Sequence, residues 1–152
     1  MRRPSFGSID GMNDKLPFGP APWRRSLYIL LSAPLDVVSL LDGGRLRQRL
    51  GGRLLGGEVP TRRLRGLLAL PFDLAATLVV LYGWSIVPMN LAYPLRPLIG
   101  FDGSLENAWG GPTLLGAWAV HALGGLVFLF LMPWVVAGFV SVQRRILGAS
   151  AG

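Results

Sequence analysis

Two polar residues, Asp73 and His121, lie inside long apolar stretches of the sequence and are the first candidates for chemistry. A carboxylate deep in an apolar span marks a functional site by default, because burying its charge is costly. If the helix around it begins near Phe72, Asp73 instead caps the helix N-terminus, where a carboxylate suits the helix dipole. We favour the cap and keep the buried site as the alternative, with Arg144 or Arg145 as its expected partner.

His121 is the only histidine in the chain. On a helix it shares a face with Ala117 and Gly124, whose small size lets a second helix approach closely. We expect the imidazole to form a packing hydrogen bond across such a contact. Haem or metal ligation would need a second donor from another copy and is the less favoured interpretation. Pro133, later in the same stretch, predicts a kink or a freed carbonyl.

The residue sets that common enzymes use are missing from this sequence. It has no cysteine, which excludes disulfides, thiolate metal sites and cysteine nucleophiles. Paired carboxylates, a Ser-His-Asp set and clustered metal ligands are not evident. The glycine-rich stretch 42–66 lacks the Gly-Lys-Ser/Thr that a phosphate-binding P-loop requires. We therefore predict a non-enzymatic protein with no cofactor, no metal and no small-molecule substrate, although bound lipids are expected.

Composition indicates that helices in a membrane position these residues. The chain has 152 residues, of which 51% are hydrophobic and only 15% charged. Residues 114–142 carry no charge at neutral pH, and this run exceeds the roughly 20 residues that cross a bilayer core. We predict transmembrane helices at 67–89 and 113–143. The external loop between them, 90–112, is long enough to hold a short helix or meet a partner.

The remaining segments predict a tail and a helix at the membrane surface. Residues 1–22 carry Gly, Pro, Ser and Asn without periodicity and indicate an extended N-terminal tail. In the segment 23–66, the apolar part 27–41 contains a proline and an aspartate. It favours an interfacial or re-entrant amphipathic helix, with a short span as the alternative. The expected fold is therefore an all-α integral membrane protein, a two-span hairpin preceded by that helix.

The distribution of positive charge predicts the orientation of the chain. Twelve of the fifteen Lys and Arg residues precede Gly66, and two more follow Val142 in the basic end 144–152. This positive-inside asymmetry places both termini in the cytoplasm of a bacterium and the spans in its plasma membrane. The net charge of +7 therefore reflects topology, and we expect no nucleic-acid partner.

Arginines alternate with leucines in the segment 42–66, and three Gly-Gly pairs should interrupt any helix there. We interpret this segment as a cytoplasmic surface that binds anionic phospholipid head groups, with a solvated topology signal as the equal alternative. The candidate lipid-contacting residues are Arg45, Arg47, Arg49, Arg53, Arg62, Arg63 and Arg65.

Two sequence repeats suggest an internal duplication. Residues 30–36 and 67–73 both read Leu-Leu-small-apolar-Pro-apolar-Asp, at an offset of 37 residues. A second pair, 49–56 and 144–148, shares an Arg-Leu-Gly exit pattern. Duplicated units are common in membrane folds. The first copy appears here without the membrane hairpin of the second.

These motifs resemble the sensor domain found ahead of the kinase core in actinobacterial sensor histidine kinases, and also found alone. The similarity rests on the Arg-rich, Leu-Leu-x-x-Pro starts at 24–35 and 62–72 and on the Pro-Trp at 133–134. It differs in its missing first hairpin and in Asp36 and Asp73, where glycine is expected. The resemblance implies a detached sensor-type module that associates laterally with other integral membrane proteins. The alternative is a permanent accessory subunit of a large membrane complex.

Overall fold

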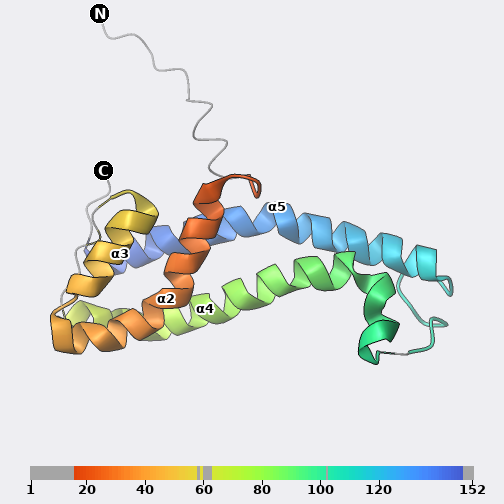
Figure 1. The fold of residues 1–152 in the computed structure, drawn as a ribbon, viewed down its shortest axis with the longest axis horizontal. Helices are drawn as coiled ribbons and strands as arrows, with labels where there is room; N and C mark the ends of the chain where they lie inside the picture. Colours follow the sequence, from red (N-terminus) through yellow and green to blue (C-terminus); the bar gives the residue numbers. More distant parts are fainter. Residues whose placement is uncertain (1–15, 58, 60–62, 102, 149–152) are drawn as a thin grey trace, which may run out of the picture. The chain divides into compact units, whose positions relative to one another are not determined.

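The computed structural model describes residues 16–57, 59, 63–101 and 103–148. Within these ranges the chain is helical and contains no strand (Figure 1). Its elements are α2 (Pro20–Asp42), α3 (Arg45–Leu55), α4 (Arg63–Leu91), the short 3-10 helix η1 (Tyr93–Ile99) and α5 (Leu114–Leu147).

The two longest helices, α4 and α5, are long and apolar enough to cross a membrane. Helix α4 contains the predicted span 67–89, and α5 contains the predicted span 113–143 except for its first residue. Only 28% of the most apolar window of each helix is buried, whereas the core helix of a soluble protein is mostly buried. Polar side chains nevertheless lie in the interior, as described below. The loop between the two helices contains η1, so the short helix that its length suggested is present.

Helix α2 begins at Pro20, so the end of the predicted tail 1–22 is helical, while residues 1–15 lie outside the described part of the chain. Proline suits this position because the first N–H groups of a helix have no intrahelical partner. Trp23 fastens the start of the helix by donating its indole N–H to the Pro17 carbonyl at 2.9 Å. The helix continues through Pro34.

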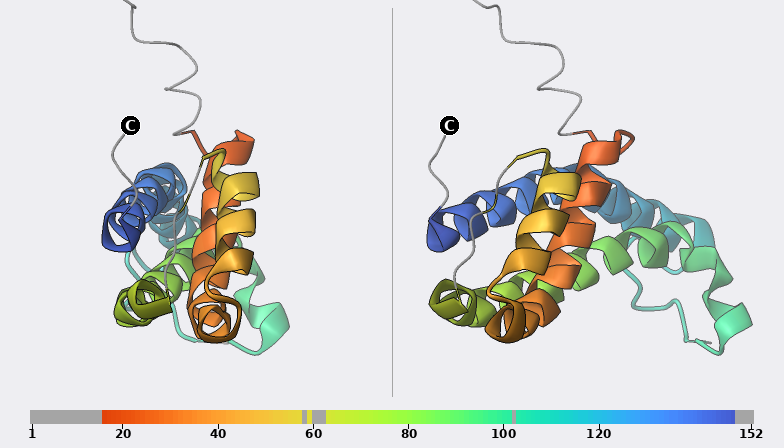
Figure 2. Two further views of the ribbon diagram at one scale, coloured as in Figure 1. Left: turned by 90° about the vertical axis from the view of Figure 1, so that its left-hand side faces the viewer. Right: turned by 60° about the vertical axis from the view of Figure 1, so that its left-hand side comes forward.

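The prediction that all three Gly-Gly pairs interrupt helices was wrong for one of them. Gly43 and Gly44 have φ angles of 71° and 87° and form the turn between α2 and α3, which lie side by side (Figure 2). The middle pair lies inside α3. A Cβ on Gly51 would lie 2.7 Å from the Val59 side chain, so close packing there requires glycine despite its low helix propensity.

The described chain divides into two compact units. The first contains α2, α3, the part of α4 up to Val80 and the part of α5 from Pro133. The second is Leu81–Met132, which includes η1. In the second unit the helices approach closely at two glycines. A Cβ on Gly83 would overlap the Met132 side chain, and one on Gly125 would lie 3.2 Å from the Val87 carbonyl oxygen.

Candidate functional site

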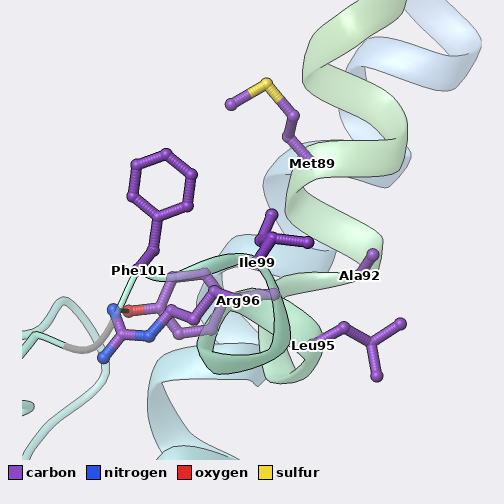
Figure 3. A pocket seen from close by; sticks show the side chains of 7 residues that line it. Met89, Ala92, Leu95, Arg96, Ile99 and Phe101 are labelled. Carbon is purple, nitrogen blue, oxygen red and sulfur yellow. Dashed lines mark hydrogen bonds between the residues drawn. The ribbon is translucent and has the colours of Figure 1, made fainter.

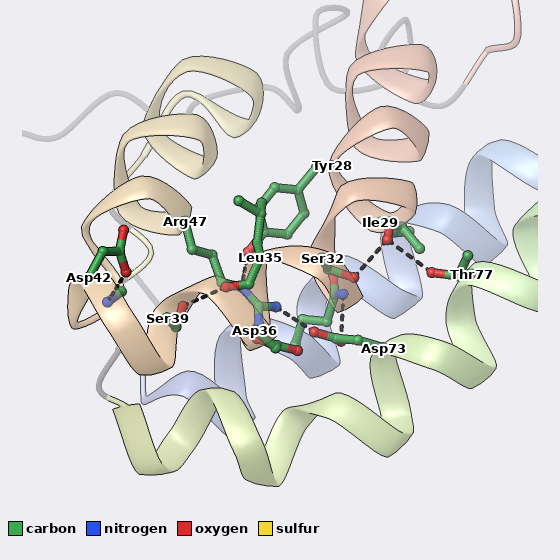
Figure 4. A network of polar contacts seen from close by, with 12 residues as sticks. Tyr28, Ile29, Ser32, Leu35, Asp36, Ser39, Asp42, Arg47, Asp73 and Thr77 are labelled. Atoms are coloured by element: carbon green, nitrogen blue, oxygen red, sulfur yellow. Dashed lines mark hydrogen bonds and ion pairs between the residues drawn. The ribbon is translucent and has the colours of Figure 1, made fainter.

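Arg47 of α3 lies at the centre of the first unit, with no part of its side chain exposed. Its guanidinium forms an ion pair with Asp36 of α2 and donates from Nη2 to Oδ2 of Asp73 on α4 at 2.6 Å (Figure 4). Its Nε donates to the Tyr28 hydroxyl at 3.2 Å. One arginine therefore joins α2, α3 and α4.

Helix α5 completes this arrangement through Gln143, whose Nε2 donates to Oδ1 of Asp73 at 2.7 Å. Burying ionised groups is stabilising only where charge and hydrogen bonds compensate for lost hydration. These contacts give the four helices one shared polar centre. We call it the Arg47 cluster; its members, each with 0% exposure, are Tyr28, Asp36, Arg47, Asp73 and Gln143.

Burial also affects the tyrosine of the cluster. Desolvation raises the pKa of the Tyr28 hydroxyl, and the positive charge of Arg47 opposes that shift. The phenol therefore remains neutral and offers its oxygen as an acceptor to Arg47. The hydroxyls of two neighbouring serines form hydrogen bonds within α2. Ser32 donates to the Ile29 carbonyl at 2.6 Å, and Ser39 donates to the Leu35 carbonyl at 2.7 Å.

The Asp42 carboxylate accepts hydrogen bonds from the backbone at the first turn of α3. Its Oδ1 accepts from the Gly44 N–H at 2.7 Å, and its Oδ2 accepts from the Leu46 N–H at 2.6 Å. The N–H groups of a first helical turn have no intrahelical partner, so the carboxylate satisfies a donor that would otherwise be unbonded. The hydrogen bond from Leu46 is the main cause that lowers the pKa of the Asp42 carboxyl.

We predict that Asp42→Ala lowers the melting temperature at about pH 7, and that this difference shrinks as the pH falls through the lowered pKa of the Asp42 carboxyl. Because the pKa is lowered by folding, the carboxylate stabilises the fold above its unfolded value of about 4 and loses that effect as the pH falls through the folded value. Thermal melts of both proteins, followed by circular dichroism across this range, measure the difference. A difference that persists undiminished at the acidic end would contradict the ionised cap.

The two copies of the first repeat meet in this cluster. Asp36 and Asp73 occupy equivalent repeat positions, and both contact the same guanidinium. Asp36 of α2 can approach α4 closely because residue 66 is a glycine. A Cβ on Gly66 would lie 3.4 Å from Oδ1 of Asp36. The duplicated aspartates thus act together, whereas we favoured a helix cap for Asp73.

The second repeat corresponds to two helix ends with matching arginine contacts. Helices α3 and α5 end before Gly56 and Gly148, whose φ angles are 66° and 84°. In the last turn of α3, the Leu55 carbonyl accepts from Arg144 at 3.3 Å. In α5, the Leu147 carbonyl accepts from Arg65 at 2.8 Å. Cationic donors suit such ends because the final carbonyls are unbonded and carry partial negative charge.

For Asp73, the structure supports the alternative that we favoured less. Helix α4 begins at Arg63, ten residues earlier, so Asp73 lies in the helix interior and does not cap it. The expected partners were also wrong. Arg144 contacts the Leu55 carbonyl and Arg145 is exposed, while Arg47 and Gln143 contact the carboxylate.

Among the candidate lipid-contacting arginines, Arg47 has a different role, because it is buried and paired. Arg65 is exposed and donates to a helix end. Arg62 lies outside the described residues, and only the backbone of Arg63 is described. The arginines that remain exposed on α3 are Arg45, Arg49 and Arg53.

In the second unit, His121 contacts its own chain. Its Nδ1 lies 2.7 Å from the Ala117 carbonyl oxygen, and its ring stacks on Tyr93 of η1 with centroids 4.0 Å apart. Ala117 is buried, as a packing position should be, but a Cβ on Gly124 would meet nothing within 4 Å. Gly125 is the glycine at the close helix contact. Pro133 is buried within α5.

A pocket of about 470 Å³ lies beside η1 (Figure 3). Arg96 contributes to its wall and is held in place by Tyr93, whose hydroxyl accepts from Nη1 at 2.7 Å and whose ring lies 4.6 Å from the guanidinium carbon. The pocket is otherwise lined by apolar side chains, among them Met89, Ile99 and Phe101. Such a site fits an apolar group of a lipid or of a neighbouring protein.

Sequence reasoning missed Tyr28, Gln143 and the structural role of Arg47. One signal was available for Arg47. On a helix it shares a face with Gly51, four residues later, while Arg45 and Arg49 point elsewhere. The Gly-Gly pairs predict that a helix in the segment 42–66 is interrupted, and in an interrupted helix Arg47 and Gly51 would not share a face. No signal in the sequence singled out Gln143.

No protein-family model matches the chain, and no curated protein or solved structure shows a significant match to it. The resemblance to the sensor domain of histidine kinases therefore rests on the motifs of this sequence alone.

Proposed function

We propose that this protein is a non-enzymatic, integral protein of the bacterial plasma membrane, with both termini cytoplasmic. It acts through lateral association of α4 and α5 with helices of another membrane protein, as a detached sensor-type module does. The observation that carries this proposal is that the first unit buries a cluster of charged and amide side chains, while α4 leaves large apolar side chains exposed.

The interior of the first unit contains charged and amide side chains, and Arg47 is its largest fully buried residue. Several outward positions of α4 are leucines, of which Leu68 is 73% and Leu78 is 68% exposed. In water this arrangement would expose a large apolar surface and bury charge at the same time. In a bilayer the exposed apolar side chains face lipid, and the polar side chains pair with one another in the bundle interior, where such groups are tolerated.

Lateral association is supported by an open face on the last helix. Trp134, Gly138 and Val142 follow one another at four-residue spacing in α5, and all three are exposed. A Cβ on Gly138 would meet nothing within 4 Å, so a neighbouring helix could approach the backbone there. Exposed arginines of α3, including Arg49 and Arg53, are suited to anionic phospholipid head groups.

A second candidate function is a permanent accessory subunit of a large membrane complex. It is favoured by exposed apolar side chains outside the two candidate spans. In and after η1, Leu98 is 82% and Phe101 is 67% exposed, beside the pocket described above. Apolar patches of this kind in a connecting segment are typical of surfaces that a partner covers.

The test is recovery of the tagged protein in a mild detergent, followed by mass spectrometry of what accompanies it. We expect another integral membrane protein in the wild-type sample and at least tenfold less of it with Gly138→Leu, since the added side chain fills the open face. Association that shifts with growth conditions favours the sensor-type module, whereas a constant ratio favours the accessory subunit.

The matched control is Gly52→Leu. Gly52 is also an exposed helical glycine whose Cβ would meet nothing within 4 Å, but it lies on α3, outside the candidate spans. This variant should recover the partner as the wild type does. Recovery of the wild-type protein alone, or only as a homodimer, would overturn both candidate functions.

A further inference from the structure

The Arg47 cluster contains more acid than base. Two carboxylates, Asp36 and Asp73, contact one guanidinium, and none of the three side chains is exposed. With both acids ionised, the cluster would hold one uncompensated negative charge inside the first unit. Removing such a charge from water is costly, and buried acids commonly avoid that cost by remaining protonated.

The contacts differ between the two acids. Asp73 accepts hydrogen bonds on both oxygens, from Arg47 at 2.6 Å and from Gln143 at 2.7 Å, so each of its oxygens already has a donor. Asp36 contacts Arg47 through Oδ1 only. Its Oδ2 is buried and has no hydrogen-bond partner among the described residues. A proton on Oδ2 would neutralise the cluster without displacing any contact.

The surrounding groups complete the charge balance. From α2, Tyr28 faces Arg47 as a neutral phenol; α3 supplies the guanidinium, and α4 supplies Asp73. From α5, Gln143 is uncharged. Arg144 keeps its positive charge, which reaches Tyr28, but it donates to the Leu55 carbonyl, and among the described residues the ion pairs of Asp36 and Asp73 are made with Arg47. The guanidinium beside Asp36 repels a metal cation, whereas a covalently held proton needs only one bare oxygen.

We propose that the Arg47 cluster is a binding site for one proton, carried by Oδ2 of Asp36 between the ion-paired helices. In this form Asp73 and Arg47 make the charged pair, Asp36 is a neutral acid, and the cluster has no net charge. Proton release leaves the excess negative charge at the α2–α4 contact and weakens it. The site therefore links the proton activity around the protein to the packing of its helices.

The experiment is infrared spectroscopy of the full chain in detergent, with aspartate labelled by 13C at the side-chain carboxyl. We expect the C=O stretching band of a protonated carboxylic acid near neutral pH, with the isotope shift of aspartate, which disappears on alkaline titration. The band should be absent in Asp36→Asn, which removes the acid. It should also be absent in Asp73→Asn, because Asp36 must then ionise to pair with Arg47.

Asp42→Asn is the matched control, since Asp42 lies on the same helix and its hydrogen-bonded carboxyl is ionised at neutral pH. This variant should keep the band unchanged. Absence of the band in the wild type at neutral pH would overturn the proposal. A band that survives in Asp73→Asn would also overturn it. The wild-type measurement remains valid even where a variant does not fold.

Replacing all sodium salts with choline salts should leave the band unaltered. A band that appears only without sodium would assign the site to a metal cation instead.

Discussion

Arg47→Met lowers the free energy of unfolding by about 3–5 kcal/mol, the usual cost of removing one partner from a buried ion pair. Methionine has a similar length, so the change removes the charge and its hydrogen bonds while retaining much of the volume. Both Asp36 and Asp73 lose their cation, and Tyr28 loses its donor. Denaturant unfolding in detergent micelles, followed by tryptophan fluorescence, measures the loss.

Two further variants separate this effect from a general effect of removing positive charge. Arg49→Met removes an exposed arginine from the same helix and should stay within about 0.5 kcal/mol of the wild type. Combining Arg47→Met with Asn at both aspartates removes every charge of the cluster and should recover most of the stability. If Arg47→Met and Arg49→Met were equally mild, the cluster would have no structural role.

Gly125→Val destabilises the second unit by about 1–3 kcal/mol, because it adds volume where two helices touch. A Cβ at this position lies 3.2 Å from the Val87 carbonyl oxygen and 3.1 Å from Cβ of Asn90, neither of which is the flexible end of a side chain. The helices must therefore separate. Thermal unfolding in detergent and exchange of the amide protons around Val87 report the change.

The neighbouring residue supplies an unusually close control. Gly124→Val makes the same substitution in the same helix, with the same change in helix propensity, and its Cβ meets nothing within 4 Å. It should alter stability by a few tenths of a kcal/mol only. Equal losses at both positions would show that the effect comes from helix propensity and not from packing.

This pair of glycines also illustrates how far sequence reasoning reaches. The length and apolarity of α4 and α5 were predictable, because those properties are local to each run of residues. The glycine at the helix contact was not, because spacing from His121 selected Gly124 and the structure uses Gly125. Which of two adjacent residues faces a helix contact depends on the rotation of the helix about its axis, and packing against the neighbouring helix determines that rotation.

In the Arg47 cluster, too, some features were predictable from the sequence and others depended on tertiary contacts. The repeat identified Asp36 and Asp73 as equivalent, and they do lie at one site. The cation between them could not be identified, since the sequence offers fifteen Lys and Arg residues of similar context. The cap favoured for Asp73 required a helix that begins near Phe72, whereas α4 begins at Arg63. Helix boundaries depend on tertiary contacts more than helix existence does.

The contacts of the polar centre imply an order of assembly during synthesis. Asp36 and Arg47 come from adjacent helices and can pair as soon as α2 and α3 have left the ribosome. Gln143, which donates to Asp73, follows it by 70 residues. Arg144, which donates to the Leu55 carbonyl at the end of α3, follows Leu55 by 89 residues. Until Gln143 and Arg144 are translated, the Asp73 carboxylate and the Leu55 carbonyl lack these hydrogen-bond donors. A stalled nascent chain therefore differs chemically from a finished one, because it exposes polar groups that later residues would pair.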